Sequence, residues 1–242
     1  MDPYIYPDNV PTGRRLSLYG RDGPIGESNA LTFEPVSKSL HNGELALRLF
    51  QNVASVEWAL YSYLGFTKQP TFQLTPAALP TYARMAAYGW SVRTSILGLL
   101  ANAEMSLYHI LENENSSARS QWRGLIGLER EIFAKLTVGA QYYVEINAQG
   151  TDNLQPELST AQHRVSLRLT YLARRDDLTL SLFGIYAPQA QDAHIRPRIA
   201  YRIADGLVTT LGANIMVGRD RQTFFGQFQD NTNVFIALRF SY

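Results

Sequence analysis

The sequence predicts an all-β protein in which one antiparallel, up-and-down sheet closes into a barrel, and three observations predict it. Apolar and polar side chains alternate with a period of two through most of residues 43–242, and only a β-strand converts that pattern into two faces. The alternating segments are roughly 10 to 14 residues long, whereas ordinary strands have about five or six. Short turns and longer polar loops separate the segments, so successive strands are expected to form hairpins.

Residues 1–42 come before the alternating region and show no sustained period. Prolines and glycines recur through them, at Pro3, Pro7, Pro11, Gly20, Gly23, Pro24, Gly26 and Pro35. We expect an irregular loop or arm here. The glycines of residues 20–23 are interpreted as a turn and not as a phosphate-binding loop, because no strand precedes them and no Lys-Ser or Lys-Thr pair follows. The chain is therefore divided into an arm, residues 1–42, and the barrel strands, residues 43–242.

Five hairpins and a final strand make up the alternating region, which gives about eleven strands. The strands are residues 44–50 and 56–64, 81–96 and 99–111, 121–132 and 136–148, 163–173 and 178–186, 194–203 and 207–217, and finally 231–242. Short turns are predicted at 51–55, 97–98, 133–135, 174–177 and 204–206, and long loops at 67–80, 112–117, 149–161 and 218–230. Short and long connections alternate strictly in this prediction. Residues 84–111 also fit a helical stripe, but their place between clear strand pairs favours strands.

Nearly every predicted strand has one apolar face and one polar face that carries charges of both signs. The charged side chains assigned to the polar face are Arg48, Arg93, Arg123, Arg164, Arg168, Arg196, Arg198, Arg202, Arg239, Glu57, Glu104, Glu129 and Glu145. A soluble barrel turns its apolar side chains inward, and about eleven strands would enclose more volume than those side chains fill. We therefore expect the polar face to line a water-filled lumen and the apolar face to contact lipid.

Composition excludes several other classes of protein. No segment reaches the roughly 18 to 20 apolar residues of a membrane-spanning helix. The formal net charge of +1 gives no general attraction to nucleic acid. The chain has no Cys, which excludes a disulfide framework and thiolate metal sites. Its four His show neither metal-ligand spacing nor a Ser-His partnership, so we predict no catalytic residue, no metal site and no cofactor.

The closing strand carries the most specific pattern in the chain. One parity holds Val234, Ile236, Leu238, Phe240 and Tyr242, so the sequence ends on an aromatic residue. A terminal Tyr or Phe preceded by alternating apolar residues resembles the closing strand of bacterial outer-membrane β-barrels of the porin-like type. The resemblance implies that this segment is the signal read by the barrel assembly machinery. It also implies that outer-membrane lipid and lipopolysaccharide surround the protein and that small solutes diffuse through it. Formation of an oligomer is compatible with the resemblance.

The sequence thus predicts a porin-like channel of the bacterial outer membrane and not an enzyme. Arginines outnumber glutamates on the predicted polar face, so we expect a weak preference for anions such as carboxylates. An outer-membrane barrel with a structural, adhesive or enzymatic role is the alternative, and a soluble β-protein is a further one.

Met1 is expected to be internal to a longer protein. The start of the chain has neither the basic residues nor the apolar stretch of a secretory signal. Single-chain bacterial barrels also have an even number of strands, with both termini in the periplasm. Because the predicted number is odd, at least one strand is expected upstream, and residues 1–42 are expected to be extracellular.

Overall fold

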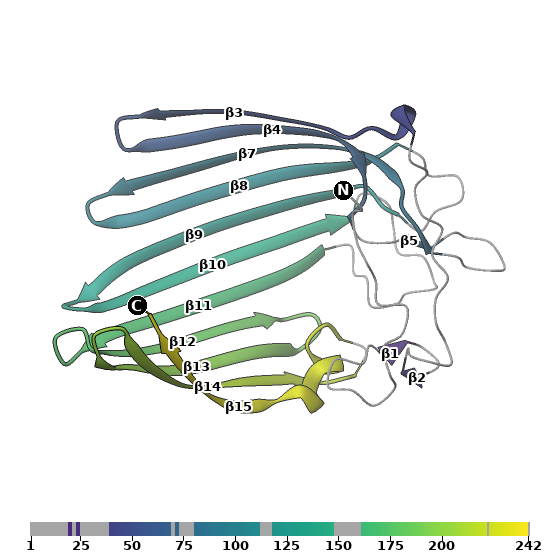
Figure 1. Ribbon diagram of the computed structural model, residues 1–242. Coiled ribbons are helices and arrows are strands. Elements are labelled where there is room, and N and C mark those ends of the chain that lie inside the picture. The colour runs from purple at the N-terminus through teal and green to yellow at the C-terminus, as the bar shows by residue number, and fades with distance from the viewer. Residues whose placement is uncertain are drawn as a thin grey trace.

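The computed structural model describes residues 19–20, 23–24, 39–68, 71–72, 80–111, 118–147, 161–221 and 223–241. Its main feature is a single curved sheet of eleven strands (Figure 1). These strands are β3 (Leu45–Val53), β4 (Val56–Phe66), β7 (Arg84–Ile96), β8 (Leu99–Ile110), β9 (Gln121–Phe133), β10 (Leu136–Asn147), β11 (Ala161–Ala173), β12 (Leu178–Ala187), β13 (Asp192–Ala204), β14 (Leu207–Gly218) and β15 (Asn233–Phe240). The smaller elements are β1 (Tyr19–Gly20), β2 (Gly23–Pro24), β5 (Thr71–Phe72), β6 (Pro80–Thr81) and the 3-10 helices η1 (Leu40–Asn42) and η2 (Gly226–Asn231).

The sheet confirms the predicted all-β, antiparallel, up-and-down architecture with eleven strands. Strand order follows the chain from β3 at one edge to β15 at the other, and every pair is antiparallel. The two edge strands have no further partner among the described residues, so the sheet is curved and open (Figure 1). The helical alternative for residues 84–111 is wrong, because β7 and β8 pair from Met85 and Ile110 to Ile96 and Leu99.

The helices of the described part of the chain are short 3-10 turns, and none of them could span a bilayer.

Five short turns reverse the chain at one end of the sheet. They lie at residues 54–55, 97–98, 134–135, 174–177 and 205–206. Leu97 and Gly98, with φ of 51° and 75°, both adopt the left-handed conformation that a two-residue hairpin turn requires. Gly206, with φ of 79°, is constrained further, because a Cβ there would collide with the carbonyl oxygen of Ser241.

Three of the predicted turns were too long, namely 51–55, 133–135 and 204–206. In each hairpin the ladder continues until only two residues remain, as the pairs Val53 with Val56 and Ala204 with Leu207 show. Side chains near a turn have few neighbours, so the alternation weakens there although the backbone still pairs.

The connections at the opposite end are longer, with one exception that corrects the prediction of strict alternation. Residues 188–191 join β12 to β13 and are as few as the turn at 174–177. β13 begins earlier than predicted, at Asp192, which pairs with Ala187 and Gly218. The predicted loop at 112–117, most of the loop at 149–161, most of 67–80 and most of the arm lie outside the described residues, and Ala161 already belongs to β11.

The two faces of the sheet differ in chemistry. Large apolar side chains of one parity remain exposed on every strand, for example Ile236 at 75%, Ile126 at 60% and Leu47 at 68%. Few apolar side chains of the described residues are buried, and Ala83, Met85, Ile110 and Ala118 form a small cluster near one end of the sheet. A soluble domain packs such a face against a second layer, and the described residues provide none. The stability of this single layer therefore depends on what covers its apolar face.

Candidate functional site

The register places every charged residue predicted on the polar face on one and the same face of the sheet. One row shows the relation, because Glu129 is opposite Gly139, which is opposite Arg168 on the next strand. The same row continues through Phe183 to Arg196. Whether this face lines a lumen stays a prediction; the polar face is the candidate functional site.

Charge is divided unevenly over the polar face. The strands β3 to β10 carry both signs, with Arg48, Arg93 and Arg123 against Glu57, Glu104, Glu129 and Glu145. The strands β11 to β15 carry Arg164, Arg168, Arg196, Arg198, Arg202 and Arg239, which we call the basic wall. No Glu lies on this second half, and its one Asp on the same parity, Asp192, is fully buried.

Ion pairs follow the same division. We call the part of the polar face on β3 to β10 the mixed half. There Arg123 Nε lies 3.4 Å from Glu145 Oε2, and Arg48 Nη2 lies 3.9 Å from Glu57 Oε1. On the basic wall, Arg202 is the one arginine with an acidic partner among the described residues. Its Nη1 lies 3.5 Å from Oδ1 of Asp177, which belongs to the turn at 174–177. The other five arginines of the wall have no ion pair among the described residues. Their field is therefore not cancelled locally.

Two arginines of the basic wall make cation–π contacts with aromatic rings. The guanidinium carbon of Arg168 lies 5.6 Å from the centroid of the Phe183 ring, and that of Arg164 lies 5.5 Å from Tyr143. Such contacts hold an arginine over an apolar surface while its edge stays open to a ligand. The basic wall can therefore present fixed, unpaired guanidinium groups.

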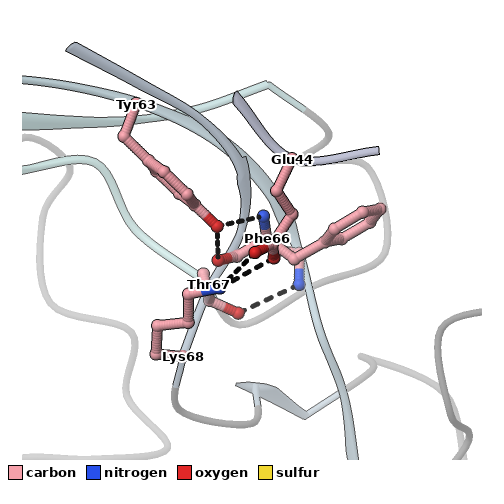
Figure 2. Close-up of polar contacts among 6 residues, drawn as sticks. Glu44, Tyr63, Phe66, Thr67 and Lys68 are labelled. Carbon is pink, nitrogen blue, oxygen red and sulfur yellow. Dashed lines mark hydrogen bonds and ion pairs between the residues drawn. The ribbon is translucent and has the colours of Figure 1, made fainter. Parts of the chain in front are cut away.

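A second polar cluster ties the ends of β3 and β4 together (Figure 2). Lys68 Nζ donates hydrogen bonds to both carboxylate oxygens of Glu44, at 2.7 and 2.8 Å, and lies 5.1 Å from the Tyr63 ring centroid. The Tyr63 hydroxyl accepts from the Phe66 N–H and donates to the Phe66 carbonyl, each at 3.1 Å. Sequence reasoning had placed Lys68 in a loop and missed the cluster; its only signal was the scarcity of lysine.

The ion pair shifts both of its groups toward their charged forms. Burial alone would raise the pKa of Glu44, but the hydrogen bonds from Lys68 and Tyr63 hold that pKa below the ordinary value of 4.5. Burial alone would lower the pKa of Lys68, but its hydrogen bond to Glu44 raises the pKa above 10.5. The stability that Glu44 contributes is therefore lost as the pH falls through its lowered pKa. The stability that Lys68 contributes is lost as the pH rises through its raised pKa.

We expect Lys68→Gln to lower the unfolding free energy by less than about 1 kcal/mol near neutral pH, because solvent screens this half-exposed pair. The difference from wild type should vanish on acidification below the pKa of Glu44. Urea unfolding of wild type and Lys68→Gln at a series of pH values measures this difference in unfolding free energy. In a Glu44→Gln background the Lys68→Gln effect should not depend on acidification; a persisting dependence would place the linkage elsewhere.

The connection between β14 and β15 folds back against the polar face. We call residues 219–221 and 223–231 the strap; they include η2. The backbone N–H of Phe225 donates to Asp192 Oδ2 at 2.7 Å, and the Phe225 ring lies 5.7 Å from the ring of His194. Asp192 is 1% exposed, and its second oxygen, Oδ1, is buried with no hydrogen-bond partner among the described residues. Sequence reasoning treated 218–230 as a plain polar loop, because a single Asp at a strand start gives no periodic signal.

Glycines allow the strap to approach so closely. A Cβ on Gly226 would collide with the carbonyl oxygen of Asp220, and a Cβ on Gly218 would collide with the backbone of Gly226. The strap therefore packs directly on the end of β14, beside the basic wall.

Among the described residues, no three His, Cys, Asp or Glu side chains come together in a way that could hold a metal. His163 and Ser166 lie on opposite faces of β11, as their spacing predicts, and contact Tyr142 and Gln141 respectively. Of the predicted assembly signal, Val234, Ile236, Leu238 and Phe240 lie on β15 with their side chains exposed, and Tyr242 lies outside the described residues.

Comparison with known proteins finds a distant structural likeness. No family model matches the chain, and no curated protein matches it. Among solved structures, a KdgM porin in complex with disordered oligogalacturonate is similar over 82% of this chain and 92% of that chain, with 10% sequence identity and a TM-score of 0.37. This likeness is too distant to carry a conclusion about the solute, which has to come from the residues of this chain.

Proposed function

We propose that this chain forms the wall of a porin-like channel in the bacterial outer membrane. Small solutes diffuse through the lumen of this channel, with a weak preference for anions. One observation carries the proposal: a single layer of long antiparallel strands has an exposed apolar face on one side and a charged polar face on the other. In water the apolar face would remain uncovered at a high cost in free energy. In a bilayer, lipid covers that face while the paired strands satisfy the backbone.

Strand length supports the same conclusion. Apart from β15, with 8 residues, the strands of the sheet have 9 to 13 residues, and about nine or more cross a bilayer at a tilt. Aromatic side chains near strand ends are typical of the membrane interfaces, and Trp58, Phe133 and Tyr186 lie at such positions. The proposal includes assembly through the closing strand, and contact with lipid and lipopolysaccharide.

The basic wall supports the anion preference. Its arginines lie on alternate strands, as Arg168 on β11 and Arg196 on β13 do on either side of Phe183 on β12. Rows of cationic side chains lower the free energy of anions in a pore, and carboxylates match the planar guanidinium. Among the described residues, ion pairs between two strands lie on the mixed half of the face, and on the basic wall Arg202 alone is paired, with Asp177 of a turn.

Reversal potentials across planar bilayers test the proposal. We expect Arg168→Glu with Arg198→Glu to lower the anion-to-cation permeability ratio by roughly twofold to fivefold, less at high salt. The matched control is Arg174→Glu with Arg175→Glu, which changes charge equally on an exposed turn and should leave the ratio near that of wild type. Cation preference in the wild type, or equal effects of the two double variants, contradicts the anion preference. Complete absence of conductance would favour a structural or adhesive barrel.

A further inference from the structure

The mixed half of the polar face contains a hollow that the anion preference does not use. It has a volume of about 880 Å³ and extends over β4, β7, β8, β9 and β10. Five tyrosines line it, and four of them lie on the polar face. We call it the tyrosine hollow after these four: Tyr61, Tyr63, Tyr108 and Tyr143. Small residues form its floor, namely Ala87, Gly89, Ser91 and Ser106. The tyrosines thus surround a floor of small residues, where a ligand can approach the backbone closely.

The tyrosines are held in place before any ligand arrives. The Tyr63 hydroxyl is bonded to both backbone groups of Phe66, and the Tyr143 hydroxyl donates to Glu145 at 2.8 Å. The hydroxyl of Tyr61 lies 3.1 Å from that of Ser91. A ligand binding between such rings loses little free energy to the ordering of side chains.

The charge of the hollow is balanced, in contrast to the basic wall, when the carboxylates next to its lining are counted. Lys68, Arg119 and Arg123 line it together with Glu104, while Glu44 and Glu145 form ion pairs with Lys68 and Arg123. Arg123 reaches into it, but Glu145 lies 3.4 Å away and Gln121 Oε1 accepts from Arg123 at 2.6 and 3.2 Å. The guanidinium carbon also lies 4.3 Å from the centroid of the Tyr108 ring. Glu104 supplies a carboxylate without an ion pair among the described residues. The hollow therefore offers ring faces and hydrogen-bonding groups without a strong field of one sign.

We propose that the tyrosine hollow is a binding subsite for a neutral saccharide. A pyranose ring has flat C–H faces that pack on aromatic rings, and a rim of hydroxyl groups that need donors and acceptors. Tyr61 and Tyr108 would pack on the faces, while Glu104, Gln121 and Arg123 would bond the rim. This inference rests on the proposed function only in that the solute reaches the hollow through a water-filled lumen.

Calorimetric titration of the full chain in detergent micelles with maltotriose as the probe tests the subsite. We expect binding that weakens by about tenfold or more in Tyr108→Ala, because a stacking surface is lost. Tyr108→Phe retains the ring and should bind nearly as wild type, and Glu104→Gln should weaken binding while preserving the fold. Phe183→Ala is the matched control, since it removes a ring of the same face that does not line the hollow. No binding by wild type, or equal loss in Phe183→Ala and Tyr108→Ala, overturns the proposal.

The outcome is separable from that of the channel proposal. Titration does not require conductance, so maltotriose binding with no ion current would support the hollow and overturn the channel. Anion-selective current with no maltotriose binding would support the channel and overturn the hollow.

Discussion

Replacement of Leu182 by Arg is expected to lower the unfolding free energy of the protein in a bilayer by about 2–4 kcal/mol, because the proposed lipid contact would desolvate a guanidinium near the midplane. Leu182 lies in the middle of β12, shares its parity with the exposed apolar side chains, and is itself 39% exposed. Urea unfolding from phospholipid vesicles measures the change.

Ser181→Arg is the matched control for this prediction. Ser181 is the adjacent residue of the same strand and lies on the polar face, opposite Thr170 and Arg198. An arginine there remains in water, and its repulsion from Arg198 should cost less than about 1 kcal/mol. Equal destabilisation by both variants would show that the two faces are not in different solvents, and the assignment of lipid to the apolar face would be wrong.

Replacement of Asp192 by Ala is expected to release the strap. The Phe225 N–H would lose its acceptor in a buried environment, which costs about 1–3 kcal/mol. Two measurements report the release: the Phe225 amide should exchange with solvent about tenfold faster or more, and the single-channel conductance should rise. The conductance rises because the strap covers part of the polar face beside the basic wall.

Two further variants make the prediction specific. Asp192→Asn keeps a carbonyl acceptor for Phe225 and should retain most of the protection of that amide. Asp230→Ala removes an acid of the strap whose pair with Arg221, at 2.8 Å, is exposed, and should change stability by less than about 1 kcal/mol. If Asp230→Ala opens the channel as much as Asp192→Ala, the buried carboxylate is not what holds the strap.

Local periodicity accounts for what could be predicted of the fold. A period of two depends on each residue and its neighbours in sequence, so the strands and their faces were predicted to within a few residues. The parity that placed Arg168 beside Ser166 and apart from Leu167 is preserved in the register. Even the ambiguous segment 84–111 could be assigned correctly, because its neighbours on both sides were clear hairpins.

The charge pattern illustrates where periodicity stops. Parity places Arg123 and Arg196 on the same face but does not show which side chain lies opposite each of them. Register brings Glu145 opposite Arg123 and Phe183 opposite Arg196. One arginine is therefore neutralised and the other is left unpaired, although the two look alike in sequence.

The sequence by itself determined the class of fold, the number of strands and the two faces, because these follow from the alternation of side chains along each strand. The tertiary structure decided which charges are cancelled, how the strap reaches Asp192, and how tyrosines of β4, β8 and β10 surround one hollow. Each of these depends on contacts between residues far apart in the chain, such as Phe225 and Asp192 or Lys68 and Glu44. Such contacts are fixed by register and by the path of the loops, and neither leaves a periodic trace in the sequence.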